Sequence, residues 1–220
     1  SIFIWNLFSF YICLYDYWKV KNSVYICSIT NNSKMITTEK TNIKELAEIL
    51  SGVYEKTTPD GEVAYIQTKD CTDSVNTRYA SRVSLAPKIQ KNLLQEGDIL
   101  FAAKGGNFSS VVFRGQEKAV ASTSFFVIRL KSSAVMPDYL CWFLRQPSVM
   151  AYFKTYQAGS AAQLIHKPAV ENLEIPVPSL EEQKTIVAIA HLSKREMELQ
   201  LAIIEKKQSI TQQLLMNKIK

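Results

Sequence analysis

Apolar residues recur at spacings of three and four through the end of the chain, where residues 180–219 contain neither proline nor glycine. This spacing predicts a single helix, which would be about 60 Å long. Just before it, Pro176 and Pro178 hold the backbone extended. Ser179, followed three residues later by Glu182, predicts a capping box at the start of the helix. The chain is therefore expected to end in one long, well-capped helix.

The second half of this predicted helix carries a coiled-coil-like row of apolar residues. The row consists of Met197, Leu201, Ile204 and Leu215, and it is widened by Ile203, Ile210 and Leu214. Gln208 and Thr211 interrupt it, and polar residues at such positions set the register of paired helices at some cost in stability. A helix of this length cannot bury its apolar row on itself, so we expect a partner helix. The simpler alternative is a terminal helix that lies along its own domain.

The apolar pattern upstream predicts a domain that mixes strands and helices. Asn42, with Glu45 three residues later, predicts the start of a helix over residues 43–50, and Gly52 would end it. Strands are predicted for 63–67, 99–103, 109–113 and 124–130, and helices for 138–145 and 148–156. The aromatic residues of these two helices recur at helical spacing, which favours a place in the core over stacking on bases: Tyr139, Trp142, Phe143, Tyr152 and Phe153.

The first 34 residues read as an apolar extension. Residues 1–18 are rich in aromatic side chains but lack the basic segment and cleavage site of a signal peptide. Asn6 and Asp16 leave too short an apolar run for a membrane span, which needs about 20 residues. Because the first methionine is Met35, we interpret 1–34 as a remnant of preceding sequence or an over-extended reading frame. A hydrophobic arm or membrane anchor is the alternative.

Charge points to an anionic partner. The net charge is +6 and the pI about 9.0, although solubility alone can explain such a balance. The distribution is more informative, because residues 74–95, 99–116 and 139–170 contain no acidic side chain. If the fold brings these three stretches together, they form a basic face of the kind that binds nucleic acid.

No recognisable catalytic or metal-binding motif stands in the chain. The cysteines, at positions 13, 27, 71 and 141, lack zinc-ligand spacing, and we interpret them as reduced thiols of a cytoplasmic protein. A P-loop lysine motif and a methyltransferase cofactor loop are absent from the sequence. Two histidines and scattered serines do not suggest a hydrolytic triad. We expect a protein that binds without catalysing, and that needs neither a metal nor a cofactor of its own.

A family resemblance begins at the helix junction. EIPVPSLEEQKTIVAIA over residues 174–190, followed by a long helix ending near QSITQQLL, resembles the specificity subunits of type I restriction–modification systems. Weaker matches upstream are VAYIQ running into Lys69-Asp70, and EGDILFAAKG over residues 96–105. The resemblance implies an α+β fold: a target-recognition domain with a mixed, largely antiparallel sheet over 35–178, then a long coiled-coil-type spacer helix over 179–220.

The resemblance also implies a role and partners. Such a chain would bind a specific double-stranded DNA sequence and direct a partner methyltransferase, which uses S-adenosylmethionine to methylate adenine; a restriction and translocating nuclease subunit is often part of the complex. With one recognition domain and one helix, the chain corresponds to half of a full specificity subunit. Pairing through Met197, Leu201, Ile204 and Leu215 would then give a homodimer, or a heterodimer with another specificity half.

Nine residues are candidates for DNA contact: Arg78, Arg82, Lys104, Asn107, Arg114, Ser160, Gln163, His166 and Lys167. In the resembled family a Gly-Ser/Thr-x-x-Gln loop, here residues 159–163, lies on the DNA side. Alanines at 161 and 162 leave out a hydroxyl often found there. Glutamine can read adenine bidentately, and lysine can hold guanine or a phosphate. The alternative is that residues 157–170 are only a connecting loop.

Two other functions remain open from the sequence. One is an adaptor whose long helix docks a partner and which never touches DNA. The other is a detached recognition module of a fused restriction–methylation enzyme, which would read DNA but lack a helix-mediated dimer. Retention on DNA that falls steeply with salt separates the adaptor from the DNA-binding proteins.

Overall fold

The structure, a computed structural model, describes residues 39–104, 108–157 and 164–219. The interpretation of residues 1–34 therefore lies outside the described residues, as do Asn107, Ser160 and Gln163. None of the described helices combines the length and hydrophobicity needed to span a bilayer.

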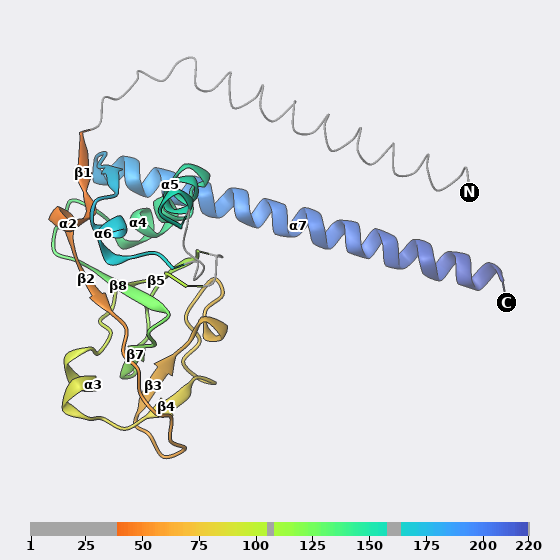
Figure 1. Cartoon of the computed structure of the whole chain (residues 1–220). Helices are drawn as coiled ribbons and strands as arrows, with labels where there is room; N and C mark the ends of the chain where they lie inside the picture. The colour runs from red at the N-terminus through yellow and green to blue at the C-terminus, as the bar shows by residue number, and fades with distance from the viewer. Residues whose placement is uncertain (1–38, 105–107, 158–163, 220) are drawn as a thin grey trace. The chain divides into compact units, whose positions relative to one another are not determined.

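In the part of the chain that the structure describes, two sheets and a short strand pair form the β-structure (Figure 1). The larger sheet is antiparallel throughout and contains, in order, β2 (Ala47–Ser51), β8 (Phe125–Leu130), β5 (Ile99–Ala102) and β6 (Ser110–Val112). The smaller sheet contains β4 (Ser81–Val83), β3 (Val63–Ile66) and β7 (Ala119–Ala121), and its β3–β7 pair is parallel. The antiparallel pair is β1 (Lys40–Asn42) with β9 (Glu174–Pro176).

The helices of the described residues are mostly short, apart from the last. They are α2 (Ile43–Leu46), α3 (Pro87–Lys91), α4 (Pro137–Leu144), α5 (Pro147–Gln157), α6 (Lys167–Glu171) and α7 (Leu180–Lys218), with a 3-10 turn, η1 (Thr68–Asp70). Together with the sheets they confirm the α+β class, the largely antiparallel pairing and the long C-terminal helix that were predicted.

Strand β5 separates two layers of core, because its side chains alternate between the two faces of the larger sheet. Ile99 and Phe101 belong to the core shared with α4 and α5, where they join Tyr139 and Phe153. Leu100 and Ala102 belong to the core shared with the smaller sheet. The domain is therefore layered as helices, larger sheet and smaller sheet. Because β5 is covered on both faces, all four of its residues are apolar and buried.

The aromatic residues of α4 and α5 are core residues, as their spacing predicts. Tyr139 and Phe153 are buried, and the other three pack against the same core with part of their surface exposed. The predicted strands around residues 63–67, 99–103, 109–113 and 124–130 are also confirmed, each to within about a residue or two at its ends. The short elements β1, β4, β7 and α3 were not predicted.

The predicted helix over residues 43–50 is wrong in its second half. Helix α2 stops at Leu46, and the next five residues form β2, which pairs along its whole length with β8. Ala47 and Ile49 are buried and Glu48 is exposed, an alternation that suits a strand with one face on the core. Tertiary pairing has therefore overridden a local sequence that favours a helix.

Gly52 does not end a helix, but its lack of a side chain is still needed. A Cβ atom at this position would lie 2.0 Å from the carbonyl oxygen of Ser122. The backbone of β2 passes here from one sheet to the other: Gly52 donates to the Phe125 carbonyl, and Val53 donates to that of Ala121. Only glycine fits such a close approach.

The segment 157–170 is not a loop throughout. Residues Lys167–Glu171 form α6, with His166 at the N-cap position and Pro168 in the first turn. Proline is tolerated there, because the first amide groups of a helix have no intrahelical acceptor. A short helix thus replaces the C-terminal part of the predicted loop.

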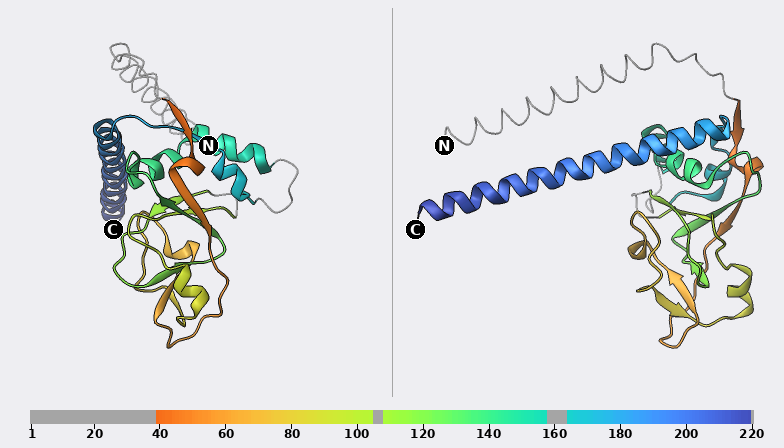
Figure 2. Two further views of the ribbon diagram at one scale, coloured as in Figure 1. Left: turned by 90° about the vertical axis from the view of Figure 1, so that its left-hand side faces the viewer. Right: turned by 180° about the vertical axis from the view of Figure 1, so that it is seen from behind.

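Helix α7 starts with the predicted capping box. The Ser179 hydroxyl accepts a hydrogen bond from the Glu182 amide at 3.3 Å, and the Glu182 carboxylate accepts one from the Ser179 amide at 2.9 Å. The first half of α7 packs against α4 (Figures 1 and 2). From Leu201 onward every described residue of α7 is exposed.

Candidate functional site

The end of β5 lies beside the segment that leads into α6. Lys104 forms a β-bridge with Leu164, and the Ile165 amide donates to the Ala103 carbonyl at 3.0 Å. The pairing brings Lys104 to the same edge of the domain as His166 and Lys167, and all three are exposed. The structure thus gathers three of the predicted DNA-contact residues from two separate parts of the chain.

Arg78 and Arg82 belong to the smaller sheet. Arg82 lies on β4, and its Nη1 donates to Glu117 at 2.8 Å. Arg78 lies in the loop before β4, with its guanidinium 5.8 Å from the ring centre of Tyr79. Tyr79 is 77% exposed, so this arginine–aromatic pair presents both a charge and a flat ring to solvent. Such a combination is suited to phosphates and bases.

Arg114 lies apart from Lys104. It follows β6, which pairs antiparallel with β5, so the two residues sit at opposite ends of the same hairpin. Nη2 of Arg114 contacts both carboxylate oxygens of Asp138, in the first turn of α4, at 2.6 Å. The hydrogen bond with Asp138 raises the pKa of Arg114 above its ordinary value. The structure does not place Lys104 and Arg114 on a shared edge.

The basic stretches are free of acids in sequence but not in space. Acids from other parts of the fold reach two of the predicted contact residues: Glu117 pairs with Arg82 and Asp138 with Arg114. Within α6, Glu171 pairs with Lys167 at 3.5 Å. Such exposed pairs stabilise the fold little, yet each lowers the positive charge open to a phosphate. None of the ion pairs between described residues includes Lys104 or Arg78.

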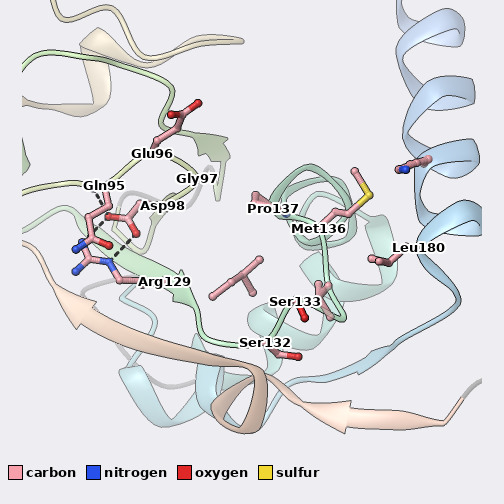
Figure 3. A pocket seen from close by; sticks show the side chains of 13 residues that line it. Gln95, Glu96, Gly97, Asp98, Arg129, Ser132, Ser133, Met136, Pro137 and Leu180 are labelled. Carbon is pink, nitrogen blue, oxygen red and sulfur yellow. Dashed lines mark hydrogen bonds and ion pairs between the residues drawn. The ribbon is translucent and has the colours of Figure 1, made fainter.

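A partly buried ion pair lies at the edge of a pocket of about 460 Å³ between the start of β5, the start of α4 and the first turns of α7. Figure 3 shows Asp98 and Arg129 on one side of this pocket, opposite Met136 and Leu180. Nε and Nη2 of Arg129 donate to the two oxygens of Asp98 at 2.8 and 2.7 Å, and the Gln95 amide donates to Asp98 as well. Because its carboxylate is engaged on both oxygens, Asp98 joins β8 to the turn before β5 rather than offering a reactive group.

Helix α7 carries two rows of side chains, each made of residues spaced by three, four, seven or eleven positions and therefore lying on one face of the helix. The domain-side row is defined as Gln183, Val187, Ala190, Lys194, Met197, Leu201, Ile204 and Leu215. Its first four members are buried or half-buried against the domain, whereas its last four are between 43% and 63% exposed. The predicted coiled-coil row is thus the continuation of the row that packs on the α+β domain.

A second row lies on another face of α7. This outer row is defined as Ile189, Leu192, Leu199, Ile203, Ile210 and Leu214, and its members are between 48% and 70% exposed. Sequence reasoning found its C-terminal members but assigned them to a widened first row. The spacing of three from Ile189 to Leu192 and of seven from there to Leu199 is the signal that separates the two rows. A helix with two exposed apolar rows can contact two partners.

A sequence model of the family described as "Type I restriction modification DNA specificity domain" matches residues 35–208. The chain belongs to this family. The specificity subunit of the type I restriction enzyme MjaVIII from Methanocaldococcus jannaschii is 25% identical over 130 residues, which are 59% of this chain and 28% of that protein. The chain thus spans under a third of the curated specificity subunit that it matches.

Solved structures support the fold of this specificity family. The HsdS subunit from Thermoanaerobacter tengcongensis has a TM-score of 0.54 at 17% identity, and the match covers 75% of this chain and 39% of that one. A chain from a structure that addresses complex assembly and conformational transition in a type I R-M system has the same TM-score and identity, covering 82% of this chain and 43% of that one. The fold described above therefore corresponds to less than half of each of these chains.

Proposed function

We propose that this chain is the sequence-specific DNA-binding component of a type I restriction–modification system and that it directs a partner adenine methyltransferase to its site. The observation that carries the proposal is the match of the specificity family over residues 35–208. The α+β domain with its long helix agrees with that family. The chain itself would be non-catalytic, with S-adenosylmethionine bound by the methyltransferase and a nuclease subunit joining for restriction.

The edge that holds Lys104, His166 and Lys167 is the part of the described domain best suited to face DNA. Two backbone segments meet there through the bridge from Lys104 to Leu164, so the backbones that carry these side chains lie next to each other. Lysine contacts to phosphate would set the register, and polar side chains would read base edges. Arg78 with Tyr79 offers a further contact from the smaller sheet.

The two rows of α7 support two helical partners. We assign the exposed part of the domain-side row to a second specificity half, either another copy or a different chain. The outer row would then contact the methyltransferase subunit. A pair of recognition domains related by a two-fold axis would read an interrupted palindrome, because the symmetry of the protein is mirrored in its site.

An adaptor that only docks helices is the second candidate, and the exposed rows of α7 favour it as much as they favour pairing in a specificity protein. The candidates separate on DNA retention at increasing salt. A specificity protein loses affinity steeply as salt rises, since each phosphate contact releases counterions. An adaptor with a net charge of +6 shows at most weak retention at low salt, with no preference for any DNA sequence.

The decisive experiment maps adenine methylation in cells that contain the cognate methyltransferase, with and without this chain. We expect a methylated motif that appears only when the chain is present. Methylation at the same motif without the chain, or no methylation with it under conditions where both proteins are expressed and associate, would contradict the proposed function.

A further inference from the structure

Gln183 is the only residue of the described helix α7 that is buried, and its side chain is fully enclosed. Its Oε1 accepts a hydrogen bond from the Met136 amide at 2.8 Å. Its Nε2 donates to the carbonyl oxygens of Ala134 at 2.7 Å and Pro178 at 2.8 Å. Both amide hydrogens and the oxygen are used, and the kinds of partner fix which end is which.

These partners come from the two segments that meet at the base of α7. Ala134 and Met136 lie between β8 and α4, and Met136 is the N-cap residue of α4. Pro178 lies in the connection from β9 to α7. The Gln183 side chain therefore joins the first turn of α7 to two segments. One is the connection from β9 to α7, and the other is the start of α4, the helix on which α7 packs. A buried amide with three partners resists displacement, because each lost partner leaves a polar group unsatisfied.

A second contact lies eleven residues further along the same row. Lys194 pairs with Asp73, in the loop between η1 and β4. The hydrogen bond from Lys194 holds the pKa of Asp73 below its ordinary value, so the pair is formed at neutral pH. Both side chains are substantially exposed, so this contact is the weaker of the two. Two points about 16 Å apart are enough to define the direction of a rigid helix.

We propose that Gln183 is a positioning residue: it sets the direction of α7 relative to the recognition domain, and through it the spacing of the two DNA half-sites. The effect on the spacing of the half-sites rests on the proposed function. From Gln183 to Lys218 the helix is about 50 Å long, so a tilt of about 10° at the base moves its end by about 9 Å. That distance is close to the length of three base pairs. If the first turn of α7 were held less firmly, a pair of recognition domains would accept several spacings between the two DNA half-sites.

The test measures the distance between the domain and the helix in the full chain. A ketone-bearing amino acid at positions 48 on β2 and 207 on α7, both exposed, takes spin labels while all native cysteines stay unchanged. Labelled chain is diluted with unlabelled chain, and pulsed electron resonance gives the distance distribution. The variants are Gln183→Met, which keeps the volume, and Gln183→Glu, which turns both donors into an acceptor facing carbonyls. Gln212→Met, on the exposed end of α7, is the matched control.

We expect a single narrow distance in the parent and in Gln212→Met, and a broadened or second population in both Gln183 variants, with the unfolding transition of the recognition domain retained. An unchanged narrow distance in Gln183→Met and Gln183→Glu would overturn the proposal. Loss of the folded domain in both variants would also overturn it, because Gln183 would then support the core rather than the direction of the helix.

A DNA readout tests the consequence. Selection from a random-sequence DNA pool should return one spacing between half-sites for the parent and several spacings for Gln183→Met. If the parent retains no DNA, the proposed function fails while the distance measurement still decides the role of Gln183. A single unchanged spacing with Gln183→Met would overturn the link between Gln183 and half-site separation.

Discussion

Lys104 and Arg114 belong to one acid-free stretch of sequence, yet their surroundings differ. Lys104 is exposed beside the segment leading to α6, and no acid among the described residues pairs with it. Arg114 is held by both oxygens of Asp138 at the other end of the hairpin. An arginine engaged in this way has less charge to offer to a phosphate and must break its pair to do so.

Replacing each residue by alanine should therefore give unequal effects on DNA binding. Lys104→Ala is expected to weaken binding to all sequences alike and to lower the salt slope by roughly one. Arg114→Ala is expected to change both quantities less. Filter or anisotropy binding to unrelated duplexes at several salt concentrations gives the slopes. Equal slope changes for the two variants would show that Asp138 does not restrain Arg114 on DNA.

Glu117 restrains a second candidate contact. Its pKa is lowered by hydrogen bonds from Thr77 and Arg82, in that order of size. The carboxylate is therefore charged at neutral pH, and it loses its pairing with Arg82 only as the pH falls below the ordinary value of 4.5. At pH 7 the charge of Arg82 is largely neutralised by this neighbour.

Glu117→Gln should tighten DNA binding at pH 7, because it removes a negative charge and releases Arg82. The salt slope should rise by up to about one phosphate contact. Glu62→Gln is the matched control, since Glu62 is exposed and forms none of the ion pairs found between described residues. An equal gain in both variants would mean that only net charge counts. An unchanged affinity in Glu117→Gln would place Arg82 away from the DNA.

The stability of the N-terminal end of α7 should depend on pH, because its capping box contains the carboxylate of Glu182. The Ser179 hydroxyl and amide hold the pKa of Glu182 below its ordinary value. A carboxylate with a lowered folded pKa contributes stability that is present above the unfolded pKa, near 4.5. The contribution is lost as the pH falls through the folded value. The start of α7 should therefore loosen between about pH 4.5 and the acid side of the folded pKa.

Hydrogen exchange at the amides of Ser179 and Glu182, the two donors of the capping box, checks this expectation. Between pH 7 and pH 3 the protection of these amides, corrected for the intrinsic pH dependence of exchange, should fall in the parent. In Glu182→Gln the protection should stay level, because glutamine can occupy the same position of a capping box without titrating. The same loss of protection in the glutamine variant would assign it to another group.

Residues 47–51 show that local sequence alone does not determine where α2 ends and β2 begins. Asn42 occupies the N-cap position, but its side chain donates to the Glu45 carboxylate at 3.5 Å and accepts no hydrogen bond from the backbone amides of the first turn. The helix it starts lasts one turn, because β8 then offers a strand partner for all five residues of β2. A helix of one turn gains little from its own hydrogen bonds. Residues 47–51 are therefore more stable as a strand paired with β8 than as a continuation of α2.

In the assembled protein the two rows of α7 should separate two kinds of association. Leu201→Glu with Ile204→Glu is expected to abolish pairing with a second specificity half, because a buried unpaired charge is costly. Leu192→Glu with Leu199→Glu, on the outer row, is expected to leave that pairing intact and to prevent association with the methyltransferase. The recognition domain should stay folded in both double variants, since all four replaced side chains are exposed and none belongs to the core clusters.

Sedimentation at micromolar concentration, alone and with the methyltransferase, measures both associations. Ala202→Glu with Ser209→Glu, on the polar face, is the control and should behave like the parent. Loss of both associations in either double variant would mean that the rows are not separate interfaces. A parent chain that sediments as a monomer when alone would exclude the homodimer and leave pairing with a different specificity half.

Features made by residues close together in sequence could be predicted from the sequence. The prolines before α7, the Ser179–Glu182 capping box, the apolar spacing of α7 and the strand around residues 99–103 depend on neighbours within a few positions. The family resemblance rested on the same segments. Such features need little chain closure, and nothing distant competes with them strongly enough to change them.

Contacts across the fold were beyond the reach of sequence patterns. Glu117 meets Arg82, Asp138 meets Arg114, and Gln183 meets Ala134 only because the sheets and α4 bring these residues together. Each contact joins residues between 24 and 49 positions apart. The entropic cost of closing such loops is offset by the packing of the whole core and not by the contact itself. The residues near each member of a contact therefore do not indicate which distant residue it meets. The surroundings of the charged side chains and the direction of α7 therefore follow from the three-dimensional packing.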